Sequence, residues 1–240
     1  MQAWKAEFYK KYPTINNAVI SRKSDFSHVP FAKHIIRTCF PPDRNIAILD
    51  LGCGFGGFLG ICRQEGYHQL RGIDISIENV SIAHQLGMNM VEQGELLDTL
   101  KRIKTESYDI VLFLDVIERF EQEDILTILQ QTFRILKKGG QGIVHVPNSE
   151  GIFGSRIRYA DFTHEMAFTQ NSLSQLFRFC GFEQFRFFED KPIVHGTVSL
   201  IRNIIWRIGT FPFRILHAAE TGNYAVILSQ NMLCSAKKGQ

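Results

Sequence analysis

Glycines and aspartates in the first third of the chain have a spacing that suits ligand binding. Gly52, Gly54 and Gly57 form a turn with almost no side chains, so a ligand can reach its backbone. An apolar stretch that ends at Asp50 leads into this turn. A second short apolar stretch ends at Asp74, whose carboxylate can accept hydrogen bonds from both hydroxyls of a ribose. The pattern predicts a βαβ unit that binds a nucleoside-containing molecule.

Two cofactors fit this glycine spacing. Gly52, Gly54 and Gly57 match the dinucleotide fingerprint G-x-G-x-x-G, which places a pyrophosphate at a helix N-terminus. Residues 50–56 also match D-x-G-x-G-x-G. Asp50 would repel a pyrophosphate, but it suits S-adenosylmethionine, which carries a cationic sulfonium and ammonium and no phosphate. The charge therefore favours the methyl donor, and a nicotinamide-dependent oxidoreductase remains an alternative.

Five segments, in order, resemble the motifs of the class I S-adenosylmethionine-dependent methyltransferases. They are residues 50–56, 72–75, 93–96, 108–118 and 136–148, and the resemblance extends from residue 46 to the C-terminus. It implies a Rossmann-like α/β fold with a seven-stranded sheet whose last strand is antiparallel, and S-adenosyl-L-methionine as the cofactor. The cofactor-binding residues that it implies are Asp50, Gly52, Cys53, Gly54, Gly56, Asp74, Ile75, Glu95, Leu96, Leu114 and Asp115.

A loop after the fifth predicted strand carries candidates for acid–base chemistry. Residues 159–169 contain Asp161, His164 and Glu165 and resemble the D-F-T-H-E segment of methyltransferases encoded with bacterial surface-polysaccharide pathways. The pKa of a free histidine lies near neutrality, so His164 can take a proton from a hydroxyl whose oxygen attacks the methyl carbon. Asp161 or Glu165 can fix the tautomer of that histidine. The resemblance implies that the acceptor is a sugar hydroxyl of a surface glycan or of its precursor.

Other roles and other acceptors remain open. Asp161 can cap a turn and His164 can be structural, and the same side chains can bind a divalent metal, although we assign no metal site. His145, on the fifth predicted strand, is a second candidate base. Glu118 and Arg119 stand where many relatives show Glu-His, so a base supplied there in relatives must come from elsewhere in this chain. The core motifs do not encode the acceptor, so C- or N-methylation of a small molecule, such as a quinone precursor, is the alternative.

The elements that position these residues follow from apolar spacing. We predict five parallel strands at roughly 46–50, 70–74, 89–92, 109–114 and 142–146, and two more at 182–188 and 223–236. Residues 110–114 form a continuous apolar run, as expected of a strand covered on both faces. Helical spacing predicts a helix over 121–138, which a lysine pair ends before Gly139. A second helix is predicted over 170–180, with Gly181 as its cap, and residues 1–44 predict helices broken at Pro13 and ended by Pro41 and Pro42.

We predict a single methyltransferase domain over residues 1–240. It comprises a helical cap (1–44), a cofactor-binding core (45–190), a helical insertion (191–222) and a last strand with a tail (223–240). Apolar residues, Trp206 and arginines alternate in residues 192–220. Such a helix can pack on the sheet or form a homodimer contact, which we favour, or lie on an anionic membrane as a peripheral contact.

Composition excludes several classes of protein. A net charge of +3 without a dense basic run argues against nucleic-acid binding. The five cysteines lack regular spacing, which predicts reduced, buried thiols. No signal peptide is recognised and no apolar run reaches membrane-spanning length. We therefore expect a cytoplasmic enzyme, at the inner face of the membrane if residues 192–220 bind lipid, with a small-molecule or glycan acceptor.

Overall fold

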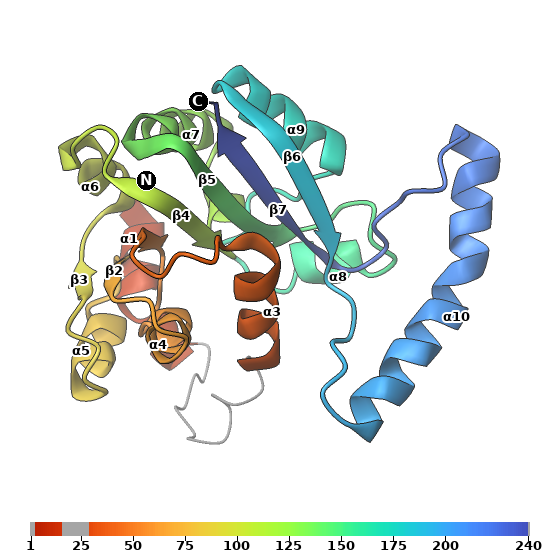
Figure 1. Ribbon diagram of the computed structural model, residues 1–240, viewed down its shortest axis with the longest axis horizontal. Coiled ribbons are helices and arrows are strands. Elements are labelled where there is room, and N and C mark those ends of the chain that lie inside the picture. The colour runs from red at the N-terminus through yellow and green to blue at the C-terminus, as the bar shows by residue number, and fades with distance from the viewer. Residues whose placement is uncertain (1–2, 16–28, 240) are drawn as a thin grey trace.

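A seven-stranded mixed sheet forms the centre of the protein (Figure 1). The computed structural model describes residues 3–15 and 29–239. The strands are β1 (Ala47–Leu51), β2 (Gln69–Asp74), β3 (Val91–Gln93), β4 (Tyr108–Leu114), β5 (Leu136–Pro147), β6 (Phe182–Glu189) and β7 (Asn231–Lys238). Their order in the sheet is β3-β2-β1-β4-β5-β7-β6, and β7 is antiparallel to both of its neighbours. The predicted Rossmann-like sheet with an antiparallel last strand is confirmed.

Helices cover both faces of this sheet. They are α1 (Ala3–Lys10), α2 (Tyr12–Ile15), α3 (Val29–Cys39), α4 (Gly57–Gln64), α5 (Ile77–Gln85), α6 (Leu96–Arg102), α7 (Gln122–Ile135), α8 (Gly154–Arg158), α9 (Gln170–Phe179) and α10 (Thr197–Thr221), with a 3-10 turn, η1 (Ile117–Arg119). One apolar cluster joins α6, α7 and α9 to the strands, and a second joins α3 and α4 to β1 and β4. Burial on both faces explains why β1 is apolar except at Asp50 and why β4 is apolar from Ile110 to Leu114.

The predicted boundary between α7 and β5 is wrong. The helix was expected to reach residue 138, but α7 ends at Ile135 and β5 begins at Leu136. The pairing of β4 with β5 shifts between Tyr108 and Ile110, because residues 137–140 form a bulge at Gly139, which has φ of 72°. Lys137 pairs with Asp109 at 2.7 Å. The lysine that was assigned to a helix terminus therefore ties the bulge to the neighbouring strand.

The other predicted boundaries need smaller corrections. The third strand was expected over 89–92 and occupies Val91–Gln93, and the helix expected to reach Cys180 ends at Phe179, with Gly181 at φ of 91°. The seventh strand was expected to begin at residue 223, but β7 begins at Asn231. The side chain of Asn148 donates hydrogen bonds to Ile227 O and Ser229 O, so the backbone of 227–229 is bound by a side chain instead of a strand. Residues 16–28 of the expected helical cap lie outside the described residues.

The predicted helical insertion is the 25-residue helix α10. Figure 1 shows α10 at the edge of the molecule, beside the sheet but separated from it. Long connections, residues 190–196 and 222–230, join it to β6 and β7. Within the described part of the chain, no helix is long and apolar enough to cross a membrane.

Candidate active site

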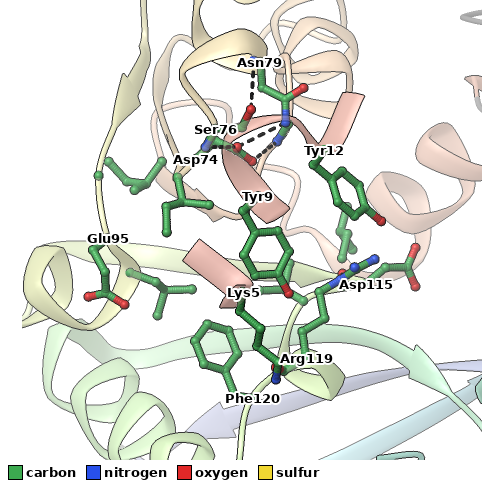
Figure 2. Close-up of a pocket in the computed structure, with 18 of the residues that line it drawn as sticks. Lys5, Tyr9, Tyr12, Asp74, Ser76, Asn79, Glu95, Asp115, Arg119 and Phe120 are labelled. Atoms are coloured by element: carbon green, nitrogen blue, oxygen red, sulfur yellow. Dashed lines mark hydrogen bonds between the residues drawn. The ribbon is translucent and has the colours of Figure 1, made fainter. Parts of the chain in front are cut away.

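A cavity of about 270 Å³ opens at the carboxyl ends of β1, β2 and β4 (Figure 2). Strand order reverses here, because β1 pairs with β2 on one side and with β4 on the other. Ligands of open α/β sheets bind at such a switch point. We call it the first cavity. Eight of the eleven residues predicted to bind the cofactor line it: Gly52, Gly54, Asp74, Ile75, Glu95, Leu96, Leu114 and Asp115.

The glycine loop after β1 requires glycine at two positions for different reasons. At Gly52 φ is 74°, and a Cβ atom there would lie 2.5 Å from a methyl group of Val116. At Gly54 φ is 57°, and a Cβ would meet nothing within 4 Å. A side chain at Gly52 would therefore collide with the protein, whereas the space beside Gly54 is open for a ligand to approach the backbone.

Asp74 holds this loop in place from the end of β2. Its Oδ2 accepts a hydrogen bond from Gly54 N at 2.8 Å, and its Oδ1 accepts from Ser76 N at 2.9 Å and from Asn79 Nδ2 at 3.1 Å. Ser76 and Asn79 also line the cavity, as Figure 2 shows, although the sequence analysis did not single them out. The sequence feature that could have identified them is Ser76, a serine at the N-cap position of α5.

Three predicted cofactor residues lie behind the loop and do not line the first cavity. Asp50 is only 2% exposed, and burial, with Asp74 adding to it, raises the pKa of Asp50 to about 7. Cys53 packs beneath β2, where its sulfur would touch a Cβ at Gly72. Gly56 has φ of 81° and begins α4. Their cofactor role stays a prediction, and in the structure they shape the loop.

The N-terminal helices supply a wall of the first cavity that the sequence analysis did not assign. Lys5, Tyr9 and Tyr12 of α1 and α2 line it. Figure 2 shows their side chains beside Arg119 and Phe120, which follow β4. No motif in the first fifteen residues identified these contacts.

Arg119 holds this wall together. Its guanidinium donates to Asp161 at 2.9 Å and to Thr163 Oγ1 at 2.6 Å, and lies 5.1 Å from the ring centre of Tyr12. The hydroxyl of Tyr12 donates to the same carboxylate of Asp161. The predicted catalytic residue Asp161 therefore joins the loop after β5 to α2 and η1. Arg119, which departs from the family pattern, is the centre of this network.

His164 lines neither the first cavity nor the second cavity described below. Its Nδ1 faces Ile157 O at 3.1 Å and its Nε2 faces Glu118 Oε1 at 3.6 Å. Burial, together with the charge of Arg119, lowers the pKa of His164. The predicted base role of His164 remains a prediction, and these surroundings favour a structural role.

A second cavity, of about 500 Å³, lies between β5, β7, the start of α3 and the start of α10. Asp115 lines both cavities, so the two share a wall. The backbone of Asp115 has φ of 57°, a left-handed conformation that is unusual for residues other than glycine. Such conformations are concentrated at functional sites.

His145 lies on the wall of the second cavity. Its Nδ1 is 2.8 Å from Asp115 Oδ1, and its Nε2 is 3.4 Å from Asp190 Oδ2. Burial by itself lowers the pKa of His145, but the two carboxylates outweigh burial and raise this pKa to about 10. The second candidate base of the sequence analysis is thus paired with acids at the boundary between the cavities.

Three residues that line the second cavity each carry a buried polar atom that has no hydrogen-bond partner among the residues that the structure describes. The atoms are Trp206 Nε1, Asn231 Oδ1 and His145 Nε2, the last of which has the Asp190 carboxylate 3.4 Å away as an ion-pair neighbour. A buried polar atom without a partner costs about 1–3 kcal/mol, so such atoms indicate that a polar ligand belongs there. The indole N–H can only donate and the amide oxygen can only accept. A ligand with hydroxyl groups, which do both, satisfies this set.

The charges of the first cavity fit S-adenosylmethionine. Its lining includes the carboxylates of Asp74, Glu95, Asp115, Glu121 and Asp124, against the cations of Lys5 and Arg119. An excess of acids attracts a ligand with a sulfonium and an ammonium group and opposes a pyrophosphate. Asp74 at the end of β2 suits the ribose, and the open space at Gly54 suits close approach to the loop.

Comparison with known proteins gives the family. The family described as "Methyltransferase domain" matches residues 27–184, more than half of the chain. No curated protein matches. A solved S-adenosylmethionine-dependent methyltransferase from Archaeoglobus fulgidus is similar in structure, with a TM-score of 0.66 and 21% identity, over 88% of this chain and 94% of that chain. One from Thermotoga maritima has a TM-score of 0.64 and 19% identity, over 98% and 99%.

A third solved structure contains a cofactor product. It is phosphoethanolamine N-methyltransferase 2 from Haemonchus contortus in complex with phosphomonomethylethanolamine and S-adenosylhomocysteine, with a TM-score of 0.62 and 17% identity, over 88% of this chain and 52% of that chain. The fold of this chain is thus one on which methyl transfer is carried out. Given the match over residues 27–184, the chain belongs to the methyltransferase-domain family, and it is an enzyme whose cofactor is S-adenosylmethionine.

Proposed function

We propose that the enzyme methylates a hydroxyl oxygen of a sugar, in a surface glycan or its precursor, and that this acceptor occupies the second cavity. The observation that carries the proposal is the set of buried polar atoms on Trp206 and Asn231 that have no hydrogen-bond partner in the described part of the chain, beside the His145–Asp190 pair that lines the same cavity. Sugar hydroxyls both donate and accept hydrogen bonds, so they match the mixed donors and acceptor of this cavity. The resemblance of residues 159–169 to polysaccharide-pathway methyltransferases supports the same acceptor class.

The geometry supports a role for His145 in removing the proton of the acceptor. S-adenosylmethionine, when bound, supplies an electrophilic methyl group and a neutral thioether as the leaving group. Asp115 accepts from His145 Nδ1, so we assign the proton transfer to Nε2, the nitrogen that lies 3.4 Å from Asp190 Oδ2 on a residue that lines the second cavity. As the acceptor oxygen bonds to the methyl carbon, Nε2 takes the hydroxyl proton. Asp115 and Asp190 stabilise the resulting imidazolium.

A second acceptor class is the amine or carbon centre of a small molecule. The Haemonchus contortus structure supports it, because that protein is named as an N-methyltransferase. An acceptor of this class would occupy the same second cavity. An amine that is already neutral depends less on a base from the protein than a hydroxyl does. The two classes therefore differ in how strongly turnover depends on His145.

Product analysis distinguishes the acceptors. The enzyme is incubated with S-adenosylmethionine labelled with carbon-13 in the methyl group and with panels of nucleotide sugars, free sugars, amines and phenols. We expect product only with a sugar, and a carbon-13 resonance in the methoxy range. A methyl resonance in the N-methyl or C-methyl range, with no product from any sugar, would replace the proposed function by the second class.

Removal of Asp74 should weaken the cofactor site. The Asp74→Ala variant should bind S-adenosylhomocysteine less tightly by about 1–3 kcal/mol, because the ribose and the N–H of Gly54 both lose a charged acceptor. Titration calorimetry measures this, with the exposed acid Asp98 replaced by alanine as the matched control. Unchanged affinity in Asp74→Ala would remove this residue from the site.

A further inference from the structure

Helix α10 carries its apolar side chains on the side that faces solvent. The buried residues of this helix are polar: Ser199, Asn203 and Thr210. The large apolar side chains are exposed, with Ile208 at 69% and Ile205 at 64%. At 100° per residue, six of them share one face opposite the buried residues. They are Ile201, Ile204, Ile205, Ile208, Phe211 and Ile215, and we call this set the outer face of α10.

Hydrogen bonds attach the inner side of α10 to the rest of the protein. Asn203 Nδ2 donates to Pro192 O at 2.7 Å, and the guanidinium of Arg214 donates to Glu189 Oε1 at 2.7 Å. Ser199 Oγ accepts from His195 N at 2.8 Å. A surface helix of a globular protein normally turns its apolar face toward the core. In α10 the apolar face points to solvent instead. Packing of this helix on the sheet, one of the roles that the sequence analysis considered, would bury that face and therefore does not apply.

Charge identifies what covers the outer face. Arg202 and Arg207 lie on its two margins, at about 140° and 280° around the helix from Thr197. Glu220, near the C-terminal end, is the single acid of α10. Glu220 lies at the same angle as Arg202, so the Arg207 margin has no acid, and an antiparallel second copy placed face to face would bring the two Arg207 margins together with no acid to pair with them. Anionic lipid headgroups are complementary to such margins, and acyl chains to the apolar strip between them.

We propose that α10 docks the enzyme on the surface of an anionic phospholipid bilayer. The helix is 25 residues, about 37 Å, long, and none of the described helices can cross a membrane, so α10 would lie in the plane of the interface. Figure 1 shows it along one edge of the molecule, where a flat surface can reach it. Burial of its isoleucines adds to the attraction of the arginines for the headgroups.

Docking by α10 would also place the second cavity at the membrane. Ser199, Arg202 and Trp206 on the first half of the helix line this cavity. An acceptor with a lipid anchor would then reach His145 from the bilayer surface, a consequence that rests on the proposed function. The docking itself rests on the outer face alone.

Flotation with lipid vesicles tests the docking. We expect the wild-type protein to float with vesicles that contain phosphatidylglycerol and to remain unbound with pure phosphatidylcholine. Ile208→Asp should lower the binding roughly tenfold or more, because it places a charge in the apolar strip. Phe179→Asp, at a position 71% exposed on α9, is the matched control and should bind like the wild type.

A second pair of variants tests the charge. Arg207→Gln should weaken binding to phosphatidylglycerol vesicles at low salt, whereas Arg102→Gln, at an exposed arginine of α6, should not. Equal binding by wild-type protein and Ile208→Asp, or no binding at all, would overturn the proposal. A dimer in sedimentation velocity that Ile208→Asp dissociates, without vesicle binding, would assign the outer face to a second copy and also overturn it. Because these readouts do not use the acceptor, they are independent of the proposed function.

Discussion

Replacement of His145 by alanine should lower the turnover number about 10²–10⁴-fold, the usual contribution of a positioned general base. The affinity for S-adenosylhomocysteine should stay near that of the wild type, because His145 lines the second cavity and not the first. Steady-state kinetics with the sugar found in the product analysis gives the turnover, and calorimetry gives the affinity.

His164→Ala is the matched histidine control for this experiment. His164 is enclosed by Ile157 O and Glu118, so its loss should lower the melting temperature and leave the turnover of the folded enzyme nearly intact. The opposite result would be a large loss of turnover in His164→Ala with an unchanged melting temperature, and normal activity in His145→Ala. That result would identify His164 as the base, as the sequence analysis favoured.

The pH dependence of kcat/KM gives a second readout of the same residue. Because Asp115 and Asp190 raise the pKa of His145, its neutral form, the one that accepts a proton, gains population only as the pH rises toward about 10. We therefore expect kcat/KM to increase from neutral to alkaline pH. Asp190→Asn removes one of the raising charges, so the rise should move to lower pH. A profile that is flat over this range would contradict the assignment.

The first cavity could be predicted from the sequence because its ligands follow strand ends. A buried strand is a continuous apolar run, and the residue that follows it lies at the edge of the sheet where ligands bind. Asp74 and Asp115 were found in this way, and both line the cavity. The glycine loop was found from the spacing of its glycines, and the structure gives the reason at Gly52, where φ is 74° and a Cβ would lie 2.5 Å from Val116.

The second cavity could not be predicted in the same way. Its unpartnered atoms come from three distant segments, at His145, Trp206 and Asn231, and only the pairing of β5 with β7 and the turn of α10 bring them together. Trp206 was read as part of an apolar surface, because spacing does not reveal that its N–H points inward. Likewise, Arg119 was noted only as a departure from a pattern. Its contact with Asp161 joins two segments that are distant in sequence, and its contact with Tyr12 depends on a helix whose sequence carries no motif.

Replacement of Glu118 by glutamine should raise the free energy of unfolding, whereas most substitutions of a buried charged residue lower it. Glu118 is fully buried, and neither carboxyl oxygen has a hydrogen-bond partner in the described part of the chain. Burial, with the charge of Asp115 adding to it, raises the pKa of Glu118. The folded protein therefore prefers the protonated acid, which a glutamine imitates in shape and charge.

The sign of the effect follows from proton linkage. Below the pKa of the unfolded chain both states hold the proton, so the two proteins should differ little there. As the pH rises, the unfolded state releases its proton first, and the free energy of unfolding of the wild type falls until the pH passes the raised pKa of the folded state. Each unit of raised pKa costs the wild type about 1.4 kcal/mol, and Glu118→Gln avoids this cost.

Urea unfolding of both proteins at about pH 5 and about pH 8 measures the difference. The advantage of Glu118→Gln should be larger at the higher pH, whereas Glu123→Gln, at an exposed acid in the first turn of α7, should give the same difference from wild type at both. An advantage that does not grow with pH would mean that Glu118 is already ionised in the folded protein. Its charge would then be balanced by Arg119, 3.5 Å away, or by His164, and the substitution would instead weaken the contacts that hold η1 against the loop after β5.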